Sequence, residues 1–86
     1  RKEASVLVMK HHLDTNNHVN NGQYVLIAAE CLPDGLQIAQ MRAEYKHPAV
    51  LDDIIVPEVF ENGGVYTVVL RSEDDKVFAV VEFIGK

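Results

Sequence analysis

The stretch DTNNHVNNGQYVLIAAEC, residues 14–31, decides how this chain folds, because a polar loop leads directly into an apolar segment with helical spacing. Its apolar residues recur at the i, i+3, i+4 and i+7 positions of one helix face, which are Tyr24, Ile27, Ala28 and Cys31. Apolar residues also fill a second face, so we predict a helix that begins at Asn21 and is enclosed on nearly all sides. The turn Pro33-Asp34-Gly35 ends it, because Pro disfavours continuation and Gly supplies the turn.

Strands are expected on both sides of this helix. Residues 6–9 form a short apolar run before it. After it, apolar and polar residues alternate over residues 39–46, and this period of two predicts a strand with one solvated face. Three further runs rich in Val, Ile and Phe predict strands at residues 54–60, 65–70 and 77–84. The order strand, loop, helix, strands predicts an α+β fold in which an antiparallel sheet wraps around one helix.

Turn residues separate the last three runs. Asn62-Gly63-Gly64 favours a tight hairpin, because Asn and Gly tolerate positive φ. Ser72-Glu73-Asp74-Asp75-Lys76 supplies the second reversal. Pro57 has no N–H to donate to a strand ladder, so we expect it at a sheet edge or a bulge.

Length and charge limit what the chain can do. Its 86 residues, 1–86, allow one domain, and a domain of this size is marginal alone, so a partner surface is expected. The first run begins without the residues that usually precede a strand, and we interpret the chain as the second half of something longer. The 13 acidic and 8 basic residues give a net charge of -5 without a basic stripe, which argues against nucleic acid.

Hydropathy and cysteine content indicate the cellular compartment of the protein. No apolar run approaches the ~20 residues that a membrane span needs, and no signal-peptide pattern is present. The one cysteine, Cys31, excludes an internal disulfide and fits a reducing cytoplasm. We therefore expect a cytoplasmic protein without membrane contact.

The polar loop in front of the helix is the strongest candidate for a functional site. Asp14, Asn16 and His18 alternate in sequence, and we expect them to share one side of an extended loop. Backbone N–H groups at a helix start are unpaired and carry partial positive charge, so they stabilise a carbonyl oxygen or an anion. A carboxylate, an amide and an imidazole beside such a helix start suggest a hydrolytic site.

The pattern Asp-x-Asn-x-His-Val-Asn-Asn-x-x-Tyr, residues 14–24, followed by a helix and an Ala-Glu-Tyr-Lys strand, resembles the acyl-acyl carrier protein thioesterases of the bacterial type. The resemblance extends over residues 10–82 and includes the stretch Pro-Ala-Val-Leu-Asp-Asp. Members of that family have two hotdog folds in tandem, each a curved antiparallel sheet around a long helix. The second contains the catalytic loop, while the first forms most of the acyl pocket.

The resemblance implies that this chain is the C-terminal hotdog of such a pair. It further implies an enzyme that needs no cofactor and releases fatty acids from acyl carrier protein. As a hotdog, the chain is expected to pair with another hotdog, either the preceding half of a longer chain or a second copy.

The resemblance also implies roles for residues of the loop. Asp14 matches the motif carboxylate, which acts as general base for water or as the nucleophile. Asn16 matches the amide that orients the water or donates to the oxyanion. His18 matches the imidazole that positions the carboxylate or protonates the leaving thiolate. The backbone N–H groups expected to face the thioester carbonyl are those of Asn20, Asn21 and Gly22.

One departure from the family's pattern lies after the predicted strand at residues 39–46. Plant-type members carry a Glu-Cys pair where this chain has Pro48-Ala49. Cys31 is expected on the buried face of the helix, where a thiol is usually inert. The residues from Pro48 onward resemble instead the simpler single-domain hotdog thioesterases, many of which use the motif Asp and the helix N-terminus alone. Tyr24, at helical spacing, is expected to pack in the core.

Three functional classes stay open. They are an acyl-acyl carrier protein thioesterase, an acyl-CoA thioesterase of the single-hotdog type, and a non-catalytic acyl-binding hotdog module. A hotdog dehydratase would need a carboxylate on the helix, and Glu30 lies too late in it. An acidic carrier protein would need a local basic patch, for which the candidates are Lys10, Arg42 and Lys46.

Four histidines, His11, His12, His18 and His47, raise the possibility of a metal site. We place His11 and His12 on a strand, where neighbouring side chains point to opposite faces and cannot converge on one ion. The chain also lacks the spaced Cys/His motif that structural zinc requires. No metal is therefore expected.

Overall fold

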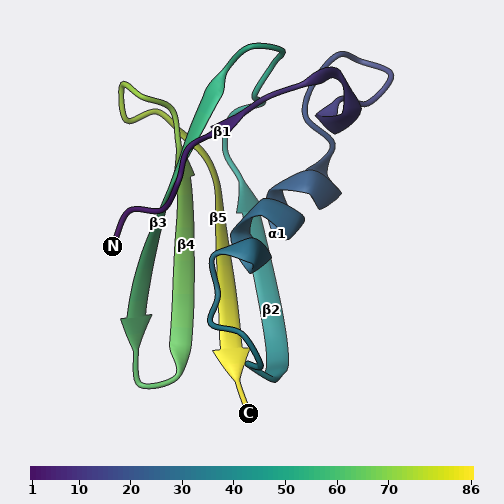
Figure 1. The fold of residues 1–86 in the computed structure, drawn as a ribbon. Coiled ribbons are helices and arrows are strands. Elements are labelled where there is room, and N and C mark those ends of the chain that lie inside the picture. The colour runs from purple at the N-terminus through teal and green to yellow at the C-terminus, as the bar shows by residue number, and fades with distance from the viewer.

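A computed structural model describes residues 1–86 and contains one α-helix packed on a five-stranded sheet (Figure 1). The chain runs through β1 (Val6–Leu7), the 3-10 helix η1 (Lys10–His12), α1 (Asn21–Glu30), β2 (Ile38–Tyr45), β3 (Ile54–Asn62), β4 (Val65–Arg71) and β5 (Val77–Gly85). The strands lie in the order β1-β3-β4-β5-β2, and every neighbouring pair is antiparallel. The predicted α+β architecture is confirmed.

Both predicted turns are present. β3 and β4 are joined through Gly63 and Gly64, whose φ values of 58° and 85° lie in the left-handed region that glycine tolerates. Between β4 and β5, Ser72 N–H donates to Lys76 O at 2.7 Å, and Asp75 takes a φ of 68°. These two turns place β3, β4 and β5 side by side, and β5 then pairs with the distant β2.

The hydrophobic core lies between α1 and the inner face of the sheet. From the helix, Tyr24, Ile27 and Ala28 are buried. From the sheet, buried side chains occur at alternate positions of β3 and β4, which are Ile55, Pro57, Val59, Val68 and Leu70. The last strand adds Phe78, Ala79, Val81 and Phe83. Burial of this apolar surface, at roughly 25 cal/mol per Å², is the main force that fixes the helix on the sheet.

The start of the chain differs from the prediction. β1 covers only residues 6 and 7, not 6–9, because Val8 turns into the core and Met9 precedes η1. His11 and His12 therefore lie in a 3-10 turn, and placing them on a strand was wrong. Their ring centroids are 4.0 Å apart.

The helix is also less enclosed than predicted. Its ten residues begin at Asn21 as expected, but Leu26 is 59% exposed, so one side of α1 faces outward. Apolar periodicity reports which residues avoid water, and it does not say whether this chain covers them. No helix in the structure has the length and apolar character required to cross a bilayer.

β2 forms the edge of the sheet beyond β5. The strand predicted from the alternation over residues 39–46 is confirmed. Its apolar face, which was expected to be buried, is partly exposed to solvent. Met41 is 45% exposed and Tyr45 is 43% exposed, while Ala43 is partly buried against the core. The free edge of the sheet thus carries apolar surface that the chain itself does not cover.

Pro57 lies within β3, one short strand away from the edge. Its carbonyl oxygen accepts the Glu3 N–H at 2.9 Å. The N–H and C=O groups of one residue in an antiparallel strand point toward the same neighbour, so the missing N–H faces the N-terminal segment and not β4. The ladder between β3 and β4 therefore loses no hydrogen bond.

Candidate active site

The loop before α1 is a tight reversal and not the extended segment that we expected. Leu13 and Val19 form an isolated antiparallel bridge, and Asp14 N–H donates to His18 O at 2.8 Å. Asn17 closes the turn with a φ of 63°, a left-handed conformation that Asn adopts more readily than most residues. Asp14 and His18 consequently face each other across the base of the turn.

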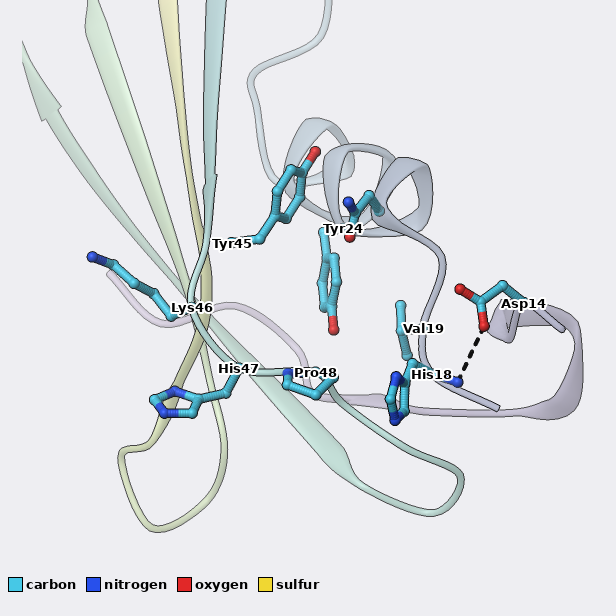
Figure 2. A pocket seen from close by; sticks show the side chains of 9 residues that line it. Asp14, His18, Val19, Tyr24, Tyr45, Lys46, His47 and Pro48 are labelled. Carbon is cyan, nitrogen blue, oxygen red and sulfur yellow. Dashed lines mark hydrogen bonds between the residues drawn. The ribbon is translucent and has the colours of Figure 1, made fainter. Parts of the chain in front are cut away.

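The Asp14 carboxylate is fixed by backbone hydrogen bonds. Its Oδ1 accepts the N–H of Asn16 at 2.8 Å. The same oxygen accepts the N–H of His18 at 3.3 Å (Figure 2). Its Oδ2 accepts no hydrogen bond from the protein. One oxygen therefore orients the side chain, and the other is free to accept a proton.

A groove of about 280 Å³ opens beside this carboxylate (Figure 2). Three segments build it: the loop, the start of α1 and the end of β2. The residues that line it are Asp14, His18, Val19, Asn21, Tyr24, Tyr45, Lys46, His47 and Pro48. Of the six site residues predicted from the sequence, the structure brings Asp14, His18 and Asn21 together in this groove.

Of the other two side chains proposed for catalysis, that of Asn16 lies outside the groove and that of His18 lines it. Asn16 is exposed at the tip of the turn, does not line the groove, and contributes only its backbone N–H to Asp14. The His18 ring lines the groove, but the backbone N–H of His18, and not its imidazole, holds Asp14. The imidazole is therefore available to a substrate.

The helix start offers one free N–H group where three were expected. Asn20 caps the helix, since its Oδ1 accepts the Gly22 N–H at 2.9 Å. The Asn20 N–H itself donates to His12 O at 2.9 Å. Only the N–H of Asn21 has no acceptor in the protein, and Asn21 lines the groove. The expectation that Asn20 and Gly22 also direct N–H groups at a substrate is corrected accordingly.

Tyr24 joins the helix to the segment after β2. Its ring is buried, as expected, and its hydroxyl oxygen accepts the Ala49 N–H at 2.8 Å. Ala49 is fully buried, and its carbonyl accepts the Val19 N–H at 2.9 Å. Burial raises the pKa of Tyr24, so the hydroxyl stays neutral. Ala49, in the Pro48-Ala49 pair that follows β2, is thus a structural support for the loop.

Replacing Tyr24 by Phe tests this support. We expect Tyr24→Phe to lower the free energy of unfolding by about 1–3 kcal/mol, because it leaves a buried N–H without an acceptor. Chemical denaturation of the two proteins measures the difference. Tyr66→Phe is the matched control, since no hydrogen bond of the Tyr66 hydroxyl is seen, and its effect should stay within about 0.5 kcal/mol. Equal effects of the two substitutions would contradict the proposed support.

The sequence did not reveal the contribution of the end of β2. The Tyr45 ring lies 5.9 Å from the Tyr24 ring between centroids. His47 Nδ1 lies 3.1 Å from Val77 O, and because a carbonyl oxygen only accepts, Nδ1 is the donor in this contact. The only sequence feature that could have indicated a role for Tyr45 and His47 is their position just before Pro48.

The three basic residues named as candidates for a carrier-protein patch lie on η1, on β2 and directly after β2. Lys46 forms an ion pair with Glu44. Arg42 lies opposite Glu82 on the neighbouring strand, and Lys10 belongs to η1. Basic groups near the groove are instead Lys46 and two histidines, His18 and His47.

The structure gathers no cluster of metal-ligating side chains, and the cysteine lies outside the groove. No group of three His, Cys, Asp or Glu side chains converges as a metal site would require. Cys31 is buried at the end of α1 and does not line the groove. Burial raises the pKa of its thiol, which disfavours the reactive thiolate.

No protein-family model and no curated protein matches this chain. Solved structures do match it. All of the chain superimposes on 37% of an acyl-ACP thioesterase from Bacteroides thetaiotaomicron, with a TM-score of 0.92 and 16% identity. The chain therefore spans little more than a third of that protein. The chain adopts the hotdog fold.

Two smaller proteins show the same likeness. The probable thioesterase YbaW from Escherichia coli matches 95% of this chain over 77% of its own length, with a TM-score of 0.80 and 23% identity. The protein SAV2348 from Staphylococcus aureus, solved in complex with CoA, matches 99% of this chain over 73% of its own length, with a TM-score of 0.82 and 16% identity. At these identities the hotdog matches establish the fold, and function has to be argued from the groove.

Proposed function

We propose that this groove hydrolyses thioesters and that its substrate is a fatty acyl group carried by acyl carrier protein. One observation supports the reaction above all others. A carboxylate with a free oxygen, Asp14 Oδ2, and an unpaired helix-start N–H, that of Asn21, belong to residues of the same groove. A base for water and a donor for an oxyanion are the two parts that thioester hydrolysis needs.

The reaction then follows from these two groups. Asp14 Oδ2 takes a proton from a water molecule as the water oxygen attacks the thioester carbonyl carbon. The oxyanion of the tetrahedral intermediate accepts the Asn21 N–H at the positive end of the helix dipole. Cleavage of the C–S bond releases the acid and a thiolate, which receives a proton from His18 or from the protonated Asp14.

The magnitudes are sufficient for modest catalysis. A positioned general base contributes about 10²- to 10⁴-fold in rate, and one oxyanion donor contributes about 3–4 kcal/mol. Together they reach about 8 kcal/mol, the low end of enzymatic acceleration. The chain therefore does not require the Glu-Cys pair of the plant-type family to act as a thioesterase.

The fatty acyl chain needs a surface that the groove does not supply. Only three of the nine residues lining it are hydrophobic. Apolar side chains are exposed nearby on β2 and on the outer side of α1, including Ile38, Met41, Tyr45 and Leu26. We propose that a second hotdog, either the other half of a longer chain or a second copy, packs against this surface and completes the acyl site. The unpaired edge of β2 offers backbone groups for the same contact.

A charge placed on β2 tests this contact. Met41→Asp is expected to separate the two hotdogs, because burying an unpaired carboxylate costs several kcal/mol. Sedimentation reports the separation of two copies, and limited proteolysis reports the loosening of two halves of one chain. Phe60→Asp is the control, because Phe60 is similarly exposed, at 47%, but lies on β3. If Met41→Asp behaves like Phe60→Asp in both measurements, the β2 contact is wrong.

The carrier is tested by presenting one acyl group on two carriers. The alternative is an acyl-CoA thioesterase, and it is favoured by the match to the CoA complex from Staphylococcus aureus. We expect kcat/KM for acyl-acyl carrier protein to exceed that for the same acyl-CoA. A higher value for acyl-CoA would overturn the carrier and keep the reaction. Acyl binding without release of thiol would favour the non-catalytic alternative.

A further inference from the structure

His12 is a buried titratable residue that the proposed mechanism does not use. It is 8% exposed, and it is the one polar or charged residue among those that are buried. Its imidazole does not line the groove. Burial of an ionisable side chain is costly unless its hydrogen-bonding groups are satisfied, so its contacts require an explanation.

One hydrogen bond of the imidazole and two of the His12 backbone give that explanation. His12 Nδ1 accepts the Met9 N–H at 2.9 Å, and the His12 N–H donates to Met9 O at 3.0 Å. The His12 carbonyl accepts the Asn20 N–H at 2.9 Å. Asn20 is the residue whose side chain caps α1 through the Gly22 N–H. His12 thus connects the η1 turn directly to the cap of the helix whose start forms one wall of the groove.

We propose that His12 is a positioning residue, which holds the η1 turn and the start of α1 in their active arrangement only while its imidazole is uncharged. The reason is the direction of the Met9 hydrogen bond. A nitrogen that accepts a backbone N–H must keep its lone pair, whereas both nitrogens of a protonated imidazole are donors. Protonation therefore sets two N–H groups against each other and releases η1. This inference rests on the proposed function, because it concerns the same helix start.

The surroundings of the ring provide no compensation for a positive charge. Burial, and secondarily the neighbouring His11, lower the pKa of His12 below its ordinary value of 6.5. Lys10 lies in the same turn, and Asp14, Asp52 and Asp53 lie in the adjoining loop and turn, but none of them pairs with the imidazole.

The sign of the pH effect follows from this lowered pKa. The folded protein binds the proton less readily than the unfolded chain. The contribution of neutral His12 to stability is therefore fully present above pH 6.5. It is lost as the pH drops from 6.5 toward the pKa of His12 in the folded protein.

The test uses amide hydrogen exchange of Asn20 and Gly22, measured between pH 8 and pH 5.5 and expressed as protection factors. In the wild type we expect protection to fall as the pH drops below 6.5, with a slope of at most about tenfold per pH unit, the limit that linkage to one proton sets. His12→Asn should abolish this dependence, because its Oδ1 can accept the Met9 N–H in place of Nδ1 and does not titrate. His11→Asn, the control, should retain it.

Two further measurements separate this inference from the proposed reaction. His12→Leu removes the acceptor, so its protection should be low at every pH, while His12→Asn at pH 8 should match the wild type. Thioesterase kcat/KM should follow the same pH profiles. Identical pH profiles of protection in the wild type and in His12→Asn would overturn the role of His12. Matching shifts in protection without any thioester hydrolysis would uphold His12 and refute the reaction.

Discussion

Asp14→Asn is expected to lower kcat for thioester hydrolysis by about 10²- to 10⁴-fold, the contribution of a positioned general base. The fold should survive, because the amide oxygen can still accept the N–H groups of Asn16 and His18 that now bind Oδ1 at 2.8 and 3.3 Å. What the amide cannot do is take a proton from water. Steady-state hydrolysis of one acyl-acyl carrier protein, together with a thermal melt, measures both properties.

Asp74→Asn provides the matched control for this experiment. Asp74 is exposed in the turn between β4 and β5, and its Oδ1 accepts a hydrogen bond from Ser72 Oγ that an amide oxygen can also accept. Its replacement makes the same change of charge without touching the site, so kcat should stay at the wild-type value. An unchanged kcat in Asp14→Asn would show that Asp14 is not the base.

Phe78→Ala is expected to lower the free energy of unfolding by about 3–5 kcal/mol through the cavity that it leaves. Phe78 is 2% exposed in the core. Its carbonyl also accepts the N–H groups of Lys46 and His47 at 2.8 and 3.2 Å, so the residue anchors the segment that lines the groove. Domains have a total stability of only about 5–15 kcal/mol, so this loss is a large part of the whole. Urea denaturation measures it.

Phe60→Ala removes the same side chain from a different environment. Phe60 is 47% exposed on β3, so little cavity forms, and the loss should stay below about 1 kcal/mol. If both variants lost the same stability, the core would not lie between α1 and the inner face of the sheet as described.

Much of the fold followed from local patterns in the sequence. The strands β3, β4 and β5 and their two turns were predicted because their signals, β-branched runs and left-handed turn residues, act over a few neighbouring residues. The exposure of Met41, Tyr45 and Leu26 was not predicted. Apolar spacing marks a face that avoids water, and it cannot say which molecule covers that face.

The site was predicted less completely, and the reasons are geometric. The alternation of Asp14, Asn16 and His18 suggested one shared side, but the left-handed φ of Asn17, 63°, reverses the chain and leaves Asn16 at the tip. Asn20 caps the helix through the Gly22 N–H and donates its own N–H to His12 O, so neither of these predicted N–H groups is free for a substrate.

Long-range contacts were beyond the reach of local patterns. The bond between Tyr24 and Ala49 joins residues 25 positions apart, and the link from His12 to Asn20 depends on a 3-10 turn that was assigned to a strand. Such contacts depend on how the elements pack, and the spacing of residues in the sequence does not predict them.

The most direct measurement of the central claim is the release of free thiol from acyl-acyl carrier protein by the purified protein, with the fatty acid identified by mass spectrometry. We predict one equivalent of fatty acid for each thiol, at a rate that Asp14→Asn reduces by about 10²-fold or more. Absence of release from the folded protein on both acyl-acyl carrier protein and acyl-CoA would contradict the assignment of this groove as a thioesterase site.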